Sequence, residues 1–348
     1  MSTVEAPGRA WFRGVRAETV VEHVDLRERP EALAGGGWWV VVAEFDGPWH
    51  AWRFRDVRAT DEVTYGPERW QGPERDGWRT SLSHEAYVAA VRAVRHEIAE
   101  GEVYQANICR VLSASVPRRP DPVGLAVRLA TGNPAPYAAL VDIPAGGAAG
   151  PGSWVVSASP ELSLEVADGT VTSGPIKGTA ATPSGLLPKD RAENVMITDL
   201  VRNDLQRVCL PGTVEVTDLL ALEEHPGLVH LVSRVRGRLL DGGGSGWSAL
   251  LAAAHPPGSV SGAPKSSALR IIEELETAPR GPYCGQIGWI DADRGQARLA
   301  VGIRTFWWAD GELRFGTGAG ITWGSDPEQE WAETELKAAR LVALASRA

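Results

Sequence analysis

Three Asp-Gly pairs separate strand-like segments of this sequence, at residues 46–47, 168–169 and 310–311. An Asp-Gly pair is a preferred two-residue hairpin turn because both positions tolerate the positive φ that such a turn needs. Hairpins join neighbouring antiparallel strands, and long helical patterns are interspersed between them without strict alternation of strand and helix. The sequence therefore predicts an α+β fold built on antiparallel sheets rather than a doubly wound parallel sheet.

Composition narrows the class of protein. Seven of the 14 tryptophans lie in the first 80 residues, and we expect a short β-rich N-terminal lobe over residues 1–80 and a catalytic domain over residues 83–348. A net charge of −9 argues against nucleic acid and acidic membrane surfaces as partners. The three cysteines are odd in number and widely spaced, which indicates neither a disulfide framework nor a zinc site. No segment reaches the length of a membrane span, so we expect a cytoplasmic protein.

Periodicity and turn signals predict the elements. Residues 228–240 read as a strand in which alternation places His230 on the more polar face with Arg234 and Arg236. The predicted helices cover residues 83–100, 123–131, 188–208, 264–276 and 326–346, the first capped by Ser83 and the last by Asp326. The main strands are predicted at residues 38–45, 49–56, 102–116, 136–143, 154–159, 161–166, 170–173, 213–222, 228–240, 283–291, 296–308 and 312–318.

Lysine is rare in this chain, which has four lysines against 31 arginines. Lysine, unlike arginine, can lose its proton and act as a nucleophile or base. Lys177 lies in a predicted loop of small residues, where Pro175 fixes the entry and Gly178 lets a ligand approach the backbone. The ordinary alternative is a turn lysine that points into water, and the motifs around Lys177 argue against it.

Acidic residues gather on two predicted helices. Glu330, Glu333 and Lys337 are spaced i, i+3 and i+7, which places them on one stripe of the C-terminal helix, and Glu193 lies on the polar helix 188–208. Two or three converging carboxylates would suit Mg²⁺, a hard cation that takes oxygen ligands and keeps several waters. A solvated face with salt bridges is the alternative interpretation of the C-terminal helix.

Two further segments could bind an anion. Arg304 lies in an otherwise apolar predicted strand, and an arginine facing a cleft there would pair with a carboxylate. Residues 316–320, Gly-Thr-Gly-Ala-Gly, could offer backbone N–H groups. Their spacing does not match a dinucleotide-binding fingerprint.

Taken together, an ordered series of motifs over about residues 83–345 resembles the chorismate-utilising enzymes. The resemblance implies one large α+β unit in which antiparallel sheets pack as a sandwich, with helices outside and the active site in the central cleft. The motifs are GEVYQANI (101–108), SPELSL (159–164), GPIKGT (174–179), KDRAENVMITDLVRNDL (189–205), VHLVS (229–233), PPGSVSGAPK (256–265), YCGQIG (283–288), GIRT (302–305) and SDPEQEWAETELK (325–337).

The resemblance also implies roles for individual residues. Lys177 would attack C2 of chorismate while the C4 hydroxyl leaves with Glu161 as general acid, and ammonia would then add at C4 and expel the lysine. Mg²⁺ would bind Glu193 and Glu333, with Glu330 in support through water. Residues implied in substrate binding or support of the site are Arg304, Tyr283, Gly318, Ala319, Gly320, Lys337, Lys265, Gln105, Thr179, Ser261 and His230.

Two positions indicate the branch of the family. Isochorismate and salicylate synthases carry a lysine where this chain has Gln105, so the glutamine resembles the ammonia-using branch. Within that branch, anthranilate synthases typically have alanine at the position of Lys177, whereas aminodeoxychorismate synthases have lysine. The expected reaction is therefore amination at C4, as by aminodeoxychorismate synthase component I in para-aminobenzoate and folate or specialised aromatic amine synthesis. The alternatives are C2 amination by an anthranilate synthase component I and a catalytically silent chorismate-binding homologue.

Some features depart from the family pattern. Gly324 stands where an acidic residue is common, and no leucine-leucine-acidic-serine stretch of the kind that builds the family's tryptophan pocket is present. None of the three cysteines lies in a nucleophile-elbow context, so we expect ammonia to come free or from a separate glutamine amidotransferase subunit.

Overall fold

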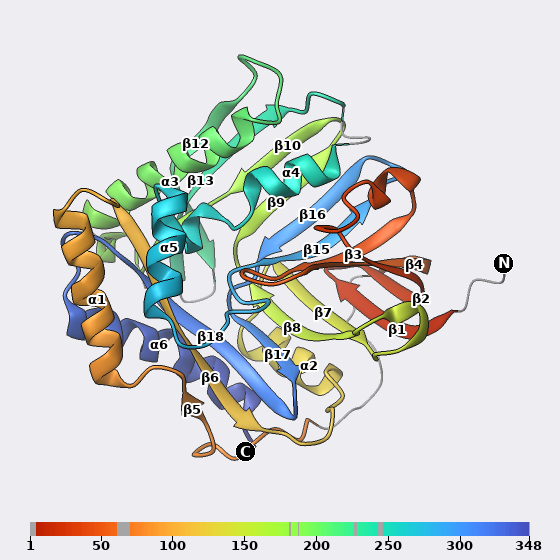
Figure 1. The fold of residues 1–348 in the computed structure, drawn as a ribbon, viewed down its shortest axis with the longest axis horizontal. Coiled ribbons are helices and arrows are strands. Elements are labelled where there is room, and N and C mark those ends of the chain that lie inside the picture. Colours follow the sequence, from red (N-terminus) through yellow and green to blue (C-terminus); the bar gives the residue numbers. More distant parts are fainter. Residues whose placement is uncertain are drawn as a thin grey trace.

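A computed structural model of the chain describes residues 5–60, 70–180, 182–186, 188–225, 228–242 and 246–347. Strands and helices are interspersed along these residues, and all strand pairs are antiparallel, so the fold is α+β (Figure 1). The helices are α1 (His84–Ala99), α2 (Val123–Gly132), α3 (Pro188–Gln206), α4 (Trp247–Ala254), α5 (Lys265–Leu275) and α6 (Pro327–Ala345). The strands are β1 (Ala6–Phe12), β2 (Gly14–Asp25), β3 (Trp38–Ala43), β4 (Trp49–Thr60), β5 (Arg79–Thr80), β6 (Gln105–Ser115), β7 (Tyr137–Ile143), β8 (Ser153–Ser159), β9 (Leu162–Ala167), β10 (Thr170–Gly174), β11 (Ile176–Ala180), β12 (Glu215–His225), β13 (Leu228–Arg238), β14 (Gly262–Ala263), β15 (Gln286–Asp291), β16 (Gln296–Val301), β17 (Thr305–Ala309) and β18 (Glu312–Ile321).

The strands follow one continuous path of antiparallel pairs. From one edge the first half of the path runs through β12, β13, β10, β9, β16, β15, β3 and β4. The second half runs through β2, β1, β7, β8, β17, β18 and β6. The N-terminal strands thus pair with strands from later in the sequence, and the division of the chain near residue 80 stays a prediction.

The largest apolar core lies between the two halves of this path. It combines Val40 and Val42 of β3 and Ile287 of β15 with Val141 of β7 and Val155 of β8, all at most 1% exposed. Residues from both halves bury their side chains against one another, as in a sheet-on-sheet sandwich.

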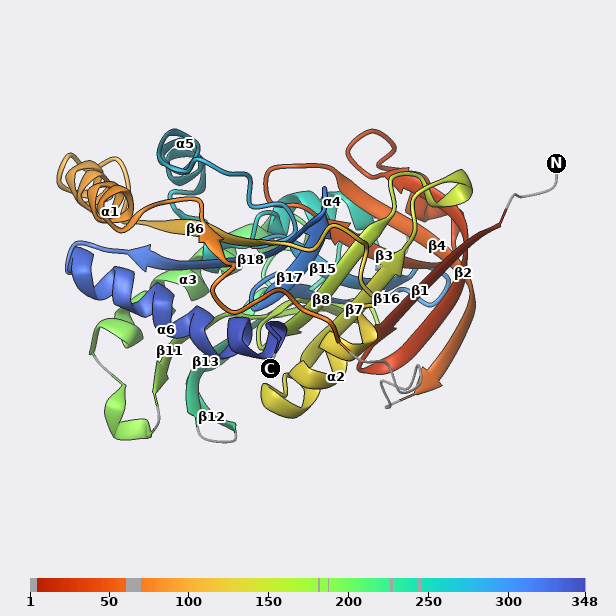
Figure 2. The ribbon, with the colours of Figure 1, turned by 90° about the horizontal axis from the view of Figure 1, so that it is seen from below.

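Helices cover the outer faces of both halves. Helices α3 and α4 pack on the first half, where Leu205 and Leu250 join a core with Leu164 of β9 and Val235 of β13 (Figure 1). Helices α2 and α6 cover the second half. Helices α1 and α5 lie together beside β6, at the end of the molecule that α6 also reaches (Figure 2).

Most predicted elements are confirmed, and their end signals work as expected. The Ser83 hydroxyl accepts a hydrogen bond from the Ala86 N–H, and the Asp326 carboxylate accepts from two N–H groups of the first turn of α6. Asp168-Gly169 and Asp310-Gly311 form the predicted two-residue hairpins, with positive φ at all four residues. The third pair, at 46–47, lies in a longer loop between β3 and β4.

The predicted strand 296–308 is wrong, because the chain leaves one half of the sheet path and enters the other within it. Strand β16 pairs with β15 and β9, whereas β17 pairs with β8 and β18. The residues between them form a loop in which Arg304 has a φ of 52°. Gly302 lies so close to Pro282 that a Cβ would be 2.1 Å from the Pro282 carbonyl oxygen. Arg304 therefore lies in a loop rather than in a strand.

Three other local predictions also need correction. Lys177 lies in a short strand, β11, because Ile176 and Thr179 pair with β13. Strand β18 extends to Ile321, beyond the predicted end at residue 318, so residues 316–320 are paired with β6 along their whole length. His230 is 3% exposed, whereas Arg234 and Arg236 farther along β13 are exposed, so the alternation of the strand alone does not predict the burial of His230.

All three cysteines are buried and none forms a disulfide. Among the described residues, no helix has the length and apolar character that crossing a membrane requires.

Candidate active site

Lys177 lies at a β-bulge in β11. Between the pairs Ile176–Val232 and Thr179–His230, β11 has one residue more than β13. Gly178 follows with a φ of 84°. A Cβ there would lie 2.8 Å from the side chain of Asp190 on α3, so glycine is required both by the conformation and by the close approach of α3.

The surroundings of Lys177 favour its neutral amine. Burial lowers the pKa of Lys177, and the positive charge of Lys337 adds to this effect. The carboxylates of Glu193, Glu161 and Glu333 oppose it. Because burial is the largest cause, more of the amine is unprotonated near neutral pH than in water, as a nucleophilic lysine requires.

The tip of Lys177 meets β18 at Gly320. A Cβ on Gly320 would lie 3.2 Å from Lys177 Nζ, 2.3 Å from Gln105 Nε2 and 2.9 Å from Asn107 Oδ1. Gln105 Nε2 donates to Asn107 Oδ1 over 3.3 Å, and Gln105 Oε1 is a buried acceptor with no hydrogen-bond partner among the described residues. The structure therefore brings Lys177, Gln105 and Gly320 together, as expected, in a space that a side chain on residue 320 would fill.

Gly318 and Gly320 direct their backbone N–H groups out of the β18–β6 ladder. On β6, the N–H groups of Asn107 and Cys109 donate away from β18, to a loop carbonyl and a glutamate side chain. Hydrogen-bonded and non-hydrogen-bonded pairs alternate in an antiparallel ladder, so Gly318–Cys109 and Gly320–Asn107 are non-hydrogen-bonded pairs. The N–H of Ala319 is therefore directed into the ladder. This geometry does not fit the predicted contact between the Ala319 N–H and an anion.

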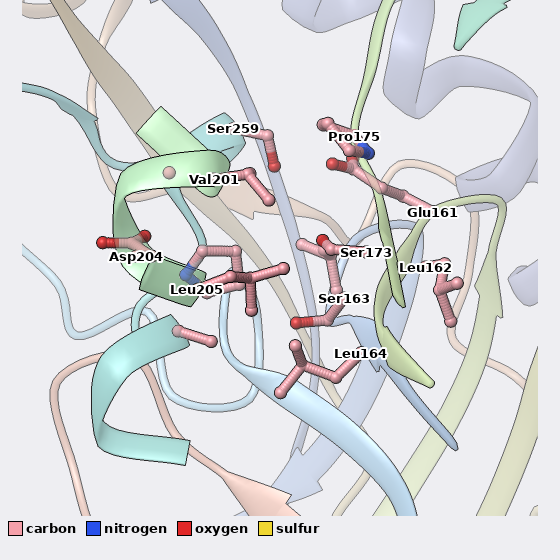
Figure 3. Close-up of a pocket in the computed structure, with 14 residues that line it drawn as sticks. Glu161, Leu162, Ser163, Leu164, Ser173, Pro175, Val201, Asp204, Leu205 and Ser259 are labelled. Atoms are coloured by element: carbon pink, nitrogen blue, oxygen red, sulfur yellow. The ribbon is translucent and has the colours of Figure 1, made fainter. Parts of the chain in front are cut away.

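Glu161 precedes β9 and is 4% exposed. Burial raises its pKa to about 7, although the facing Ser259 hydroxyl, the Lys177 ammonium and the backbone of Ile176 lower it. Glu161 and Ser259 line one end of a small cavity (Figure 3). The centre of a water molecule could occupy a volume of about 20 Å³ in this cavity. A carboxylic acid that is half-protonated near neutral pH is suited to general acid catalysis.

The three predicted metal-binding carboxylates come from α3 and α6. Burial raises the pKa of Glu193 and of Glu330, and the charge of Glu333 contributes to both shifts. For Glu333 burial acts in the same direction, but Lys337, whose Nζ lies 2.7 Å from its Oε1, and Lys189 and Lys177 keep the pKa below its usual value. The acidic groups are thus close enough to interact electrostatically.

The donor chemistry of these carboxylates fits a hard cation. Within the described part of the chain, no three acidic, histidine or cysteine side chains are close enough together to hold a metal ion. The groups offer oxygen ligands only, and the ammonium of Lys337, which also donates to Gly318 O over 3.0 Å, supplies positive charge beside Glu333. Mg²⁺ often binds through one or two carboxylates while it keeps its waters, so a preformed cage of three ligands is not required.

Arg304 and Tyr283 differ in their availability. The pKa of Arg304 is lowered by burial alone, with no acidic group among the causes, so this partly buried guanidinium lacks a carboxylate partner in the described residues. Tyr283 is 5% exposed, its hydroxyl is 3.7 Å from Cys109 Sγ, and its ring packs against Gly316. Arg304 therefore has the properties of an anion-binding group, whereas Tyr283 is part of the core.

The remaining predicted residues lie around this site. Lys265 Nζ forms a largely buried ion pair of 2.8 Å with Asp204 of α3, so its charge is already neutralised. The Ser261 hydroxyl donates to Pro257 O within its own loop. His230 is buried on β13 opposite Thr179. The side chain of Thr179 lies outside the described part of the chain.

Asn107 and Ser259 were not among the residues predicted to form the site. Asn107 shares a face of β6 with Gln105 because residues two apart in a strand point the same way, and this signal could have identified it. Ser259 lies in PPGSVSG, where its orientation toward Glu161 depends on a loop with no periodicity. Asn107 could therefore have been predicted from the sequence, whereas Ser259 could be identified only from the tertiary structure.

Comparison with known proteins identifies the family. The profile described as chorismate binding enzyme matches residues 49–343. This chain belongs to the chorismate-binding enzymes. The predicted resemblance is confirmed.

Relatives of this chorismate-binding enzyme carry two different names. An anthranilate synthase component 1 of Haloarcula marismortui is 35% identical over 322 residues, which cover 86% of this chain and 63% of that protein. An aminodeoxychorismate synthase of Streptomyces pristinaespiralis is 39% identical over 270 residues, or 74% of this chain and 36% of that protein. An aminodeoxychorismate synthase component 1 of Klebsiella aerogenes is 36% identical over 277 residues, or 76% and 59%. The chain spans less than two thirds of the length of these curated relatives.

Solved structures share the fold. A structure described as a 2,3-dihydroxybenzoate-specific isochorismate synthase from Bacillus anthracis has a TM-score of 0.81 at 23% identity, covering 97% of this chain and 96% of the other. An anthranilate synthase component I from Streptococcus pneumoniae has a TM-score of 0.77 at 24% identity, covering 97% and 92%. The predicted α+β fold of the chorismate-utilising enzymes is confirmed.

Proposed function

We propose that this enzyme aminates chorismate at C4 with ammonia to give 4-amino-4-deoxychorismate, the reaction of aminodeoxychorismate synthase component I. The observation that carries the proposal is the position of Lys177, whose Nζ lies beside Gly320, as does the Gln105 amide, and whose pKa is lowered by burial. Two relatives named aminodeoxychorismate synthase, at 36% and 39% identity, support it. The pathway would be para-aminobenzoate synthesis or that of a specialised aromatic amine.

In the proposed mechanism the neutral Lys177 amine attacks C2 of chorismate. Both ring double bonds shift, and the C4 hydroxyl leaves as water with the proton of Glu161. The resulting Glu161 carboxylate takes a proton from the alkylated Lys177 nitrogen. Ammonia then adds at C4, both double bonds shift back, and Lys177 leaves as an amine with the proton returned by Glu161. The nitrogen added at C4 carries one extra proton, which it releases to solvent. Glu161 takes up a proton again and is ready for the next turnover.

Other residues would bind the dianionic substrate. Arg304 and the N–H groups of Gly318 and Gly320 would hold the enolpyruvyl carboxylate, since charged and backbone donors suit a carboxylate. We propose that Glu193 and Glu333, with Glu330 in support, hold Mg²⁺. When bound, the cation would neutralise the ring carboxylate of chorismate and polarise the substrate.

A second candidate is amination at C2, the reaction class of anthranilate synthase. Relatives with that name match this chain at a similar identity, 35% for the Haloarcula marismortui protein and 38% over 284 residues for that of Streptomyces coelicolor. Lys177 favours C4, because a covalent bond at C2 would block ammonia there. We further propose that ammonia is supplied free or by a separate glutamine amidotransferase subunit.

The experiment that separates the candidates identifies the products. The purified chain is incubated with chorismate, Mg²⁺ and ammonium chloride, and products are measured by mass spectrometry, anthranilate fluorescence and a pyruvate assay. Aminodeoxychorismate without stoichiometric pyruvate is expected, since C4 amination retains the enolpyruvyl group. Lys177→Ala should lower this activity and should abolish any adduct seen in the intact-protein mass. Anthranilate with stoichiometric pyruvate from the wild type would instead establish C2 amination.

A further inference from the structure

Arg280 and Glu276 form a buried ion pair that contacts two elements of the candidate active site. Arg280 is 1% exposed, and its Nε and Nη2 donate to the two carboxylate oxygens of Glu276 over 2.8 and 2.6 Å. The guanidinium also lies over the ring of Phe45, 4.1 Å from its centroid. A fork-to-fork pair of this kind fixes direction as well as distance.

The pair is hydrogen-bonded to two separate elements. Arg280 Nη2 donates to Asn107 O of β6 over 2.9 Å, and Glu276 Oε1 accepts the N–H of Cys109, also of β6, over 2.8 Å. Arg280 Nη1 donates to Val260 O over 2.9 Å, in the loop 257–261. One buried side-chain pair thus joins the backbone of β6 to that of the loop.

These two elements carry side chains to opposite parts of the site. Strand β6 places Gln105 and Asn107 next to the space occupied by Lys177 Nζ. The loop 257–261 places Ser259 opposite Glu161, at one end of the cavity in Figure 3. A displacement of the loop relative to β6 would therefore alter the surroundings of both proposed reacting groups.

We propose that Arg280 and Glu276 are positioning residues that fix β6 and the loop 257–261 relative to each other. They hold Gln105 beside Lys177 and Ser259 beside Glu161. The inference rests on the proposed function, in which Lys177 and Glu161 react. A pair with a stabilising role alone would affect unfolding without affecting turnover by the folded enzyme.

The decisive variant replaces the pair by apolar residues, Arg280→Met with Glu276→Leu. This double substitution leaves no unpaired buried charge, and such replacements are often neutral for stability. It removes the hydrogen bonds to Val260 O, Asn107 O and the Cys109 N–H. The control is Arg9→Met, which removes a partly buried arginine that pairs with two carboxylates, Asp121 and Asp142.

Chorismate consumption is measured at saturating Mg²⁺ and at a constant concentration of unprotonated ammonia, at a temperature where all proteins are folded. Because consumption does not depend on which product forms, the assay tests positioning separately from C4 specificity. The double variant should lose about 100-fold in kcat, since a misplacement of about 1 Å has effects of this size. The KM for chorismate should change less than threefold.

The pH profile gives an independent measure. The groups that face Glu161 are the Ser259 hydroxyl, the Lys177 ammonium and the backbone of Ile176, and each favours its carboxylate form. Withdrawal of Ser259 should move the basic limb of the kcat profile to higher pH, because the acid would then keep its proton longer. Arg280→Lys, which retains the charge but lacks the fork, should show both effects and serves if the double variant does not fold. The same kcat and pH profile in these variants as in Arg9→Met would overturn the proposal.

Discussion

Gly320→Ala tests whether the contact between β18 and the tip of Lys177 is essential. The new methyl group would lie 2.3 Å from Gln105 Nε2 and 3.2 Å from Lys177 Nζ. Ordinary carbon contacts begin at about 3.4 Å, so Gln105 must move by about 1 Å and Lys177 by a few tenths of an ångström. Both atoms are at the ends of flexible side chains, and the backbone conformation at Gly320 does not require glycine.

The expected result is a large loss of activity with a modest loss of stability. Crowding of this kind typically costs about 1–3 kcal/mol of the free energy of unfolding. A 1 Å displacement of a group at the reacting centre lowers kcat/KM by about 100-fold, equivalent to about 2.7 kcal/mol of transition-state stabilisation. Activity should therefore fall even where the variant is fully folded.

The assay combines urea unfolding with steady-state chorismate consumption. Gly237→Ala is the matched control, because its methyl group would meet Cys209 Sγ at 2.7 Å in a core that α3 and α4 cover. The control should lose stability in the same range and retain its kcat/KM per folded molecule. If Gly320→Ala has a kcat/KM within threefold of the wild type, the structure misplaces Gln105 and Lys177 relative to β18.

Two further predictions concern charge. Glu193→Gln and Glu333→Gln should each remove Mg²⁺-dependent activity and weaken the binding of Mn²⁺, measured by electron paramagnetic resonance, with little change in melting temperature. Full activity of the wild-type enzyme in excess EDTA would exclude the metal. Burial raises the pKa of Glu161 from 4.5 to about 7, so the folded state binds a proton that the unfolded chain releases, and stability from this group falls as pH rises from about 4.5 to 7. Glu161→Gln does not titrate, and its free energy of unfolding relative to that of the wild type should rise by up to about 3 kcal/mol between pH 4 and pH 8; parallel curves for the two proteins would contradict the buried position.

Local signals were sufficient for most of the secondary structure. The Ser83 and Asp326 caps and the hairpins at 168–169 and 310–311 each depend on residues adjacent in sequence, so their geometry follows from local sterics and hydrogen bonding. The break at Arg304 was not predictable in this way. It arises because β16 and β17 belong to different halves of the sheet path, and pairing between halves is a non-local property.

The candidate site shows the same difference between local and non-local information. The sequence by itself determined which residue types were available: a rare lysine at 177, carboxylates on two helices, and motifs that resemble the chorismate-utilising enzymes. Only the tertiary structure decided that Lys177 meets Gln105 at Gly320, that the Ala319 N–H is directed into the ladder, that Tyr283 is part of the core, and that Arg280 joins β6 to the loop of Ser259. The physical reason is that residue type sets the chemistry a group can perform, whereas burial, pairing register and the approach of chain segments distant in sequence decide which groups meet and in which protonation state.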